Sequence, residues 1–196
     1  MDIKTFINNP RITDYSFRLA KFIFDNSKTL DKKLLLDLYN YNLSLCQGTS
    51  ALYPQSNWQS HRLCLMSSIA FVLNNKNLIQ ECENLCLIWI SVSDCNCCLA
   101  KSQDYHYRDS CEYVIYGWWA LVQAYVYLQK NTNKPYKYLF TNYFKWLEPY
   151  QNGSIKHIEF KNSKNMPSDL SKPNYGKVFD PNYNINFMRV YNLLKN

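Results

Sequence analysis

Apolar residues recur at every third or fourth position along most of the chain, which is the period of an amphipathic helix. In the first such stretch, Phe17, Ala20 and Phe24 fall on one helical face. The pattern predicts helices over the ranges Thr13–Asn26, Asp31–Cys46, Ser56–Leu73, Leu78–Val92, Asp109–Gln129, Pro135–Leu147 and Asn182–Leu194. We therefore predict an all-α fold in a single domain that spans residues 1–196.

Two local signals refine this picture. Ser56 precedes Gln59 by three residues, which is the capping-box spacing of a helix N-terminus. The segment 149–181 has scattered Gly, Pro and Ser residues in place of the helical period, and its short run His157–Phe160 alternates in polarity. We expect an ordered loop or small hairpin there, with a β-like segment near residues 155–161, lying over the helical core.

The most apolar predicted helix is too short to span a membrane. Its stretch Val114–Leu128 is interrupted by Gln123, whereas a span needs about 20 consecutive apolar residues. We interpret it as a central buried helix. The start MDIKTF has no signal-peptide pattern, so the prediction is a cytoplasmic or virion-associated protein that does not bind a membrane.

Composition changes this picture only slightly. The 4 glycines are too few for a β-sandwich with many tight turns. The 17 tyrosines suit a polar sugar-binding groove, but an AT-rich gene produces the same excess. A net charge of +7 favours an anionic partner. Because the lysines are scattered, with no basic helix or arm, we do not expect nucleic acid to be that partner.

The chain has 8 cysteines, which we expect to be reduced thiols in the absence of an export signal. Cys95, Cys97 and Cys98 lie close together in the sequence and His106 follows them, which is a composition that a zinc site can use. The C-x-C-C spacing differs from the two-residue spacing of zinc knuckles. We therefore predict no metal and no cofactor.

Three polar motifs carry the candidate chemistry. Asn57 and His61 lie one turn apart at the start of a predicted helix, where the positive helix terminus favours a neutral imidazole that can act as a general base. The alternative is a histidine that only bonds a neighbouring carbonyl.

In the second motif Arg108 can bind a carboxylate in a bidentate manner, or form a structural ion pair with Asp109.

The third motif is the run H-I-E-F-K-N-S-K, residues 157–164. Alternation places His157, Glu159 and Lys161 on one side of a short strand. A face of this kind is either part of a binding site or simply solvated, and the residues alone leave both open.

Taken in order, the runs N-W-Q-S-H-R-L, Y-R-D-S-x-E-Y-V-I-Y and H-I-E-F-x-N-S-K resemble the alginate-lyase-like family of polysaccharide lyases. The resemblance covers roughly residues 56–196. It implies an (α/α) toroid whose helix pairs surround a groove for an acidic polysaccharide, and cleavage of a uronate-containing chain by β-elimination. That reaction requires neutralisation of the substrate carboxylate, a base for the C5 proton and an acid for the departing oxygen.

The resemblance also assigns roles to residues. It implies that Asn57 and Arg108 neutralise the carboxylate, that His61 is the base and that Tyr113 is the acid, or both acid and base for one sugar epimer. The residues that would line or brace the groove are Arg62, Tyr107, Tyr116, His157, Glu159 and Lys164, with Tyr116 as the alternative phenol. No metal is needed, since Arg and Asn groups can do the neutralising.

The chain departs from the family pattern in two respects. Only two predicted helices precede Ser56, so we expect an incomplete toroid, whose uncovered apolar faces favour a homo-oligomer. Gly117, Trp118 and Trp119 stand where the family often has polar and acidic residues. One alternative is therefore a non-catalytic descendant, which binds acidic glycan or serves as a structural partner. Another, motivated only by the net charge of +7, is a helical nucleic-acid-binding domain.

Overall fold

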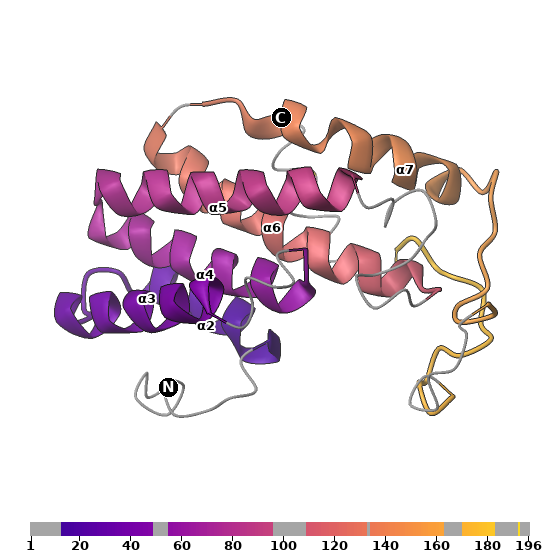
Figure 1. Cartoon of the computed structure of the whole chain (residues 1–196), viewed down its shortest axis with the longest axis horizontal. Coiled ribbons are helices and arrows are strands. Elements are labelled where there is room, and N and C mark those ends of the chain that lie inside the picture. Colours follow the sequence, from indigo (N-terminus) through magenta and orange to yellow (C-terminus); the bar gives the residue numbers. More distant parts are fainter. Residues whose placement is uncertain are drawn as a thin grey trace.

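The computed structural model describes residues 13–48, 55–95, 109–132, 134–162, 170–182 and 192. These residues form an array of helices without a β-strand (Figure 1), so the all-α prediction is confirmed. The elements are α2 (Thr13–Asp25), α3 (Lys32–Gln47), α4 (Asn57–Leu73), α5 (Lys76–Cys95), α6 (Cys111–Thr132), the 3-10 helix η2 (Tyr136–Phe140) and α7 (Thr141–Gln151). Closure of these helices into a toroid stays a prediction.

The helix ends follow local capping chemistry. The Asp31 carboxylate accepts a hydrogen bond from Lys33 N at 2.7 Å at the start of α3, and Ser56 Oγ accepts one from Gln59 N at 3.1 Å at the start of α4. The predicted helix over 135–147 is divided into η2 and α7, and α7 continues past Pro149 to Gln151. Proline in the last turn removes only one backbone donor, so it does not end the helix where we predicted. The predicted helix over 182–194 lies almost entirely outside the described residues.

The Ser56 cap supports a first stability prediction. We expect Ser56→Ala to lower the free energy of unfolding by about 1 kcal/mol, because the Gln59 N–H would lose its acceptor in a buried site. Urea denaturation followed by circular dichroism measures the change. The control is Ser44→Ala on exposed α3 surface, which we expect to stay within about 0.5 kcal/mol of the parent protein. Equal effects of the two substitutions would contradict the capping role.

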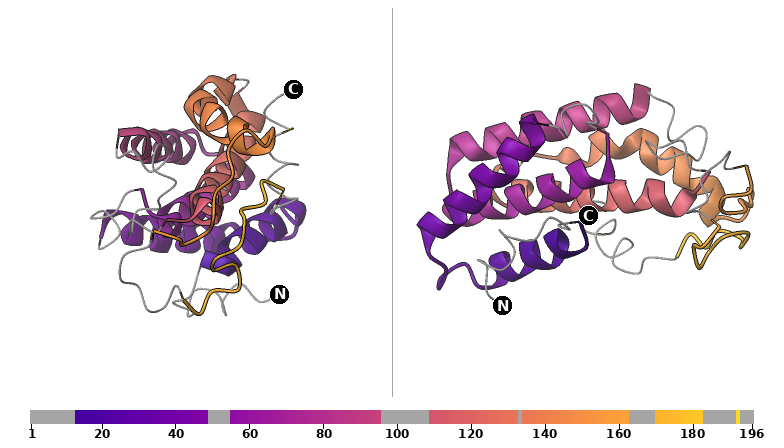
Figure 2. Two further views of the ribbon diagram at one scale, coloured as in Figure 1. Left: turned by 90° about the vertical axis from the view of Figure 1, so that its right-hand side faces the viewer. Right: turned by 60° about the horizontal axis from the view of Figure 1, so that its bottom comes forward.

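Helix α4 occupies the middle of the array, where it packs on α2, α3, α5 and α6 (Figure 2). Every residue from Gln59 to Ala70 is buried, so α4 has no solvent-facing side over this length. Its polar groups are accommodated inside the array; for example, Ser68 Oγ donates to Ala20 O of α2 at 2.7 Å. The sequence predicted α6 as the central buried helix. The structure confirms the burial of α6 and shows that α4 is equally enclosed.

An aromatic cluster joins α6 to the helices around it. The Trp118 ring stacks on Tyr143 of α7 at a centroid distance of 4.7 Å and meets Trp89 of α5 edge-on at 5.0 Å. Trp89 Nε1 in turn donates to Ser56 O at 2.9 Å. These contacts fix α5, α6 and α7 relative to the first turn of α4.

The segment after α7 folds back on the start of α6. Ile158 and Val178 form an antiparallel bridge, flanked by hydrogen bonds from Glu159 N to Lys177 O at 2.9 Å and from Phe179 N to His157 O at 2.8 Å. The predicted β-like run is therefore present as one isolated bridge. Among the described helices, none combines the length and the apolar character that crossing a membrane requires.

Candidate functional site at the start of α6

The described parts of the three polar motifs, which are far apart in sequence, meet along the first turns of α6. His61 of α4 lies against Tyr116 of α6, with ring centroids 4.3 Å apart. One residue further on, a Cβ atom on Gly117 would lie only 3.7 Å from Asn57 Cα. His157 and Glu159 lie at the N-terminal end of the same helix. Helix α6 is thus the common support of the candidate site.

The imidazole of His61 is enclosed by aromatic rings. It has no exposed surface, lies tilted on Tyr116 and meets Trp119 edge-on at a centroid distance of 6.4 Å. Tyr116, the alternative phenol, is therefore in direct contact with the candidate base. Tyr113 lies one turn earlier, with its ring 6.1 Å from Phe160 and the Lys172 ammonium 5.7 Å from its centroid.

Glu159, which belongs to the third motif, caps the N-terminus of α6. Its carboxylate accepts hydrogen bonds from Cys111 N at 2.9 Å, from Glu112 N at 3.4 Å and from the Ser110 hydroxyl. A carboxylate in this position also interacts favourably with the positive end of the helix. Burial raises the pKa of Glu159 to about 7, although the Ser110 hydrogen bond and the nearby His157 act in the opposite direction.

His157 lies between two carboxylates. Its Nε2 atom is 3.3 Å from Asp109 O, 3.4 Å from Asp109 Oδ1 and 3.9 Å from Glu159 Oε1. Asp109 also accepts hydrogen bonds from Asn162 N at 2.7 Å and from Phe160 N at 2.6 Å. The two motifs are therefore joined by charged and hydrogen-bonded contacts, and the segment around Glu159 is held firmly on α6.

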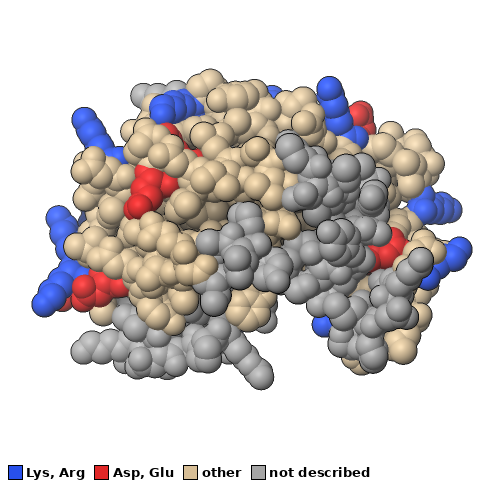
Figure 3. Space-filling model, viewed as in Figure 1, with Lys and Arg blue, Asp and Glu red and all other residues tan. Residues whose placement is uncertain are grey.

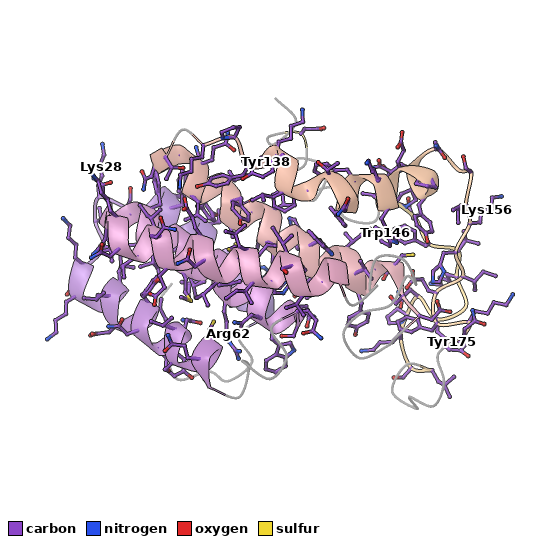
Figure 4. The ribbon with its side chains drawn as sticks, turned by 45° about the horizontal axis from the view of Figure 1, so that its top comes forward. Lys28, Arg62, Tyr138, Trp146, Lys156 and Tyr175 are labelled. Atoms are coloured by element: carbon purple, nitrogen blue, oxygen red, sulfur yellow. The ribbon has the colours of Figure 1, made fainter. Side chains whose placement is uncertain are left out.

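Arg62, which we predicted to line the groove, is enclosed beside Trp58. Only 6% of its surface is exposed, its guanidinium lies 5.8 Å from the Trp58 ring centroid, and burial lowers its pKa. Figure 4 shows Arg62 beside α4, well apart from Tyr175 in the loop that covers the start of α6. Three further predicted residues, Arg108, Tyr107 and Lys164, lie outside the described residues.

Sequence reasoning overlooked several residues that build this site. Asp109 and Ser110 precede a helix, which is a recognisable cap signal, but we considered Asp109 only as a partner of Arg108. The involvement of Cys111, Asn162 and Lys172 had no local signal, because each depends on a contact made by the folded chain.

A pocket of about 770 Å³ lies away from this site, between η2 and α7. Its lining includes Lys137, Tyr138, Phe144 and Lys145, and none of the residues that we predicted for the site. Tyr138 is 69% exposed. The pocket thus combines an accessible phenol with two ammonium groups and the Glu148 carboxylate, a polar lining that can contact sugars.

The charged side chains can be followed on one face of the molecule. On the face shown in Figure 3, the described Lys and Arg side chains lie mainly at the edges of the molecule. Among the described residues of that face, a continuous basic stripe, as expected for a nucleic-acid-binding protein, is not visible. We retain the prediction that nucleic acid is not a partner.

Comparisons with family models, curated proteins and solved structures find no match to this chain. The family resemblance therefore continues to rest on the three motifs alone.

Proposed function

We propose that the chain is a polysaccharide lyase that cleaves a uronate-containing polysaccharide, alginate-like or glucuronan-like, by β-elimination. The observation that supports this most strongly is the meeting of the three motifs on α6, with His61 against Tyr116 and with His157 and Glu159 one to two turns away. Residues that are dispersed along the chain are thereby gathered at one end of one helix.

In the proposed reaction, Asn57 and Arg108 neutralise the substrate carboxylate, which acidifies the C5 proton. His61 accepts that proton, the C4–O bond breaks as the C4=C5 double bond forms, and a phenol donates a proton to the departing oxygen. Tyr113 is the acid that the resemblance implies. Tyr116 is the phenol in ring contact with His61. Because His61 is fully buried, we expect substrate binding to displace the side chains that cover it.

The test is the ultraviolet absorbance of an unsaturated uronate during incubation with alginate, glucuronan and related polyuronates. We expect the parent protein to cleave at least one substrate. The cleavage rate should fall at least 100-fold in His61→Ala, and equally in the one of Tyr113→Phe and Tyr116→Phe that removes the acid. Tyr127→Phe, the same exchange three turns along α6 where the ring packs on Phe24 at 5.2 Å, is the matched control. Absence of turnover on every substrate would reject the lyase.

A second candidate is a non-catalytic protein that binds acidic glycan. It is favoured by the complete burial of His61 and by the separate pocket that Tyr138 and Lys145 line. Affinity electrophoresis in a polyuronate gel distinguishes the two functions. Retardation that is lost in Tyr138→Ala and Lys145→Ala, without turnover by the parent protein, would establish the binding protein.

Self-association also stays a prediction. Leu87 and Ile88 are adjacent on α5 and expose 43% and 50% of their surface. Apolar side chains of this kind are available for contact with a second copy.

A further inference from the structure

Three potential metal ligands of three chemical kinds lie together where the segment after α7 meets α6. The Cys111 thiol, a His157 ring nitrogen and a Glu159 carboxylate oxygen all lie within 4.8 Å of one another. Asp109 Oδ1 is 3.4 Å from His157 Nε2. Neither the cysteine-rich turn at 95–98 nor the lyase chemistry involves this combination.

We propose that Cys111, His157 and Glu159, with a water molecule in the fourth position, bind a divalent metal ion of the zinc class. Tetrahedral zinc has ligand bonds of about 2.0–2.3 Å, which place neighbouring ligand atoms roughly 3.3–3.8 Å apart. The separation of 3.9 Å between His157 Nε2 and Glu159 Oε1 is close to that spacing, and the three ligand atoms all lie within 4.8 Å of one another. Small side-chain shifts complete the geometry.

The mixture of donors determines which ion fits. Calcium and magnesium prefer shells made entirely of oxygen, whereas a thiolate and an imidazole select zinc and neighbouring transition metals. Asp109 is 4% exposed and Glu159 is fully buried, so two carboxylates share an enclosed site with His157. A divalent cation offsets the cost of burying both negative charges.

Hydrogen bonds from neighbouring groups hold the Glu159 and Asp109 carboxylates in fixed orientations. Glu159 accepts from the Ser110 hydroxyl and from Cys111 N, and Asp109 Oδ2 accepts from Asn162 N at 2.7 Å. Hydrogen bonds of this kind orient the carboxylates at metal sites. The positive end of α6 opposes a cation, but the Glu159 carboxylate accepts the hydrogen bond of Cys111 N at that helix end and adds a negative charge there. The His157 side chain is 13% exposed and provides contact with solvent.

The metal would fasten the segment 157–162 to α6. This role is independent of β-elimination, so a protein without lyase activity can still show it.

The experiment titrates the chelator-treated full-length chain with Co²⁺, whose spectrum reports thiolate ligation directly. We expect saturation at one ion per chain, tetrahedral visible bands, a sulfur-to-cobalt charge-transfer band, and displacement by Zn²⁺. Zn²⁺ should also raise the melting temperature, because it binds the folded state. Cys111→Ser should lose the charge-transfer band and weaken binding at least 10-fold.

A matched control separates this site from the other thiols. The triple variant Cys95→Ser, Cys97→Ser, Cys98→Ser should retain the band and the affinity of the parent protein. His157→Gln, at a partly exposed position, provides a second loss variant if Cys111→Ser does not fold. No saturable band in the parent protein would overturn the proposal. Loss of the band in the triple variant would also overturn it, as would a band that persists in Cys111→Ser. If Cys111→Ser does not fold, binding by His157→Gln as tight as in the parent protein would overturn it instead.

Discussion

Replacing Trp118 with alanine is expected to lower the free energy of unfolding by about 3–5 kcal/mol. The side chain is 2% exposed, stacks on Tyr143 with an interplanar angle of 6° and meets Trp89 and Phe140 edge-on. Its removal would leave a cavity where α5, α6, η2 and α7 meet, and the surrounding helices can collapse into it only partly.

Urea denaturation followed by far-ultraviolet circular dichroism measures this loss without depending on tryptophan fluorescence. Trp118→Phe keeps an aromatic ring beside Tyr143 and should cost less than half as much as alanine. Trp58→Ala is the matched control, because Trp58 is 42% exposed and its ring lies 5.8 Å from the Arg62 guanidinium, whereas Trp118 is buried. We expect that control to cost about 1 kcal/mol or less. A similar cost for Trp58→Ala and Trp118→Ala would show that the cluster does not organise the core.

Replacing Gly117 with leucine is expected to lower the free energy of unfolding by about 2–3 kcal/mol. A Cβ atom at this position would already lie 3.3 Å from Trp89 Cζ2 and 3.7 Å from Asn57 Cα and Cβ. A leucine side chain therefore has to push α4 or α5 away from α6. Because this crossing also brings His61 to Tyr116, any polyuronate cleavage should fall together with stability.

Gly117→Ala is the matched control for this prediction. Alanine adds only the Cβ atom, and its better helix propensity of about 1 kcal/mol offsets the need for Trp89 to move by a few tenths of an ångström. We expect the alanine variant to stay within about 1 kcal/mol of the parent protein. If leucine were tolerated as well as alanine, the close approach of α4 and α6 at Asn57 would be wrong.

Gly117 also explains a departure from the lyase family pattern. Gly117, Trp118 and Trp119 stand where that family often has polar and acidic residues. In the structure, the glycine lets the first turn of α4 approach α6, and Trp118 fills the space between α6 and α7. The replacement therefore has a packing role, and this role is compatible with a site made by the neighbouring Tyr113 and Tyr116.

The helices and most of their ends could be predicted from the sequence, because their causes are local. The apolar period acts within a few turns, and the Ser56 cap reaches only to Gln59. Pro149 misled the prediction because a proline signals a helix end without indicating whether one further turn is tolerated. The burial of α4 on every side was not predicted. Its serines, His61 and Arg62 resemble a solvated face unless their tertiary neighbours are known.

The sequence alone determined the all-α class, the order of the helices and the three motifs that carry candidate chemistry. Only the tertiary structure decided how those motifs are combined. It placed Glu159 at the N-terminus of α6 across a sequence separation of 48 residues, set His61 against Tyr116 and enclosed Arg62 within the array. The physical reason is that such contacts depend on helix crossings and on burial, which arise from the whole packed chain and leave no periodic signal around any single residue.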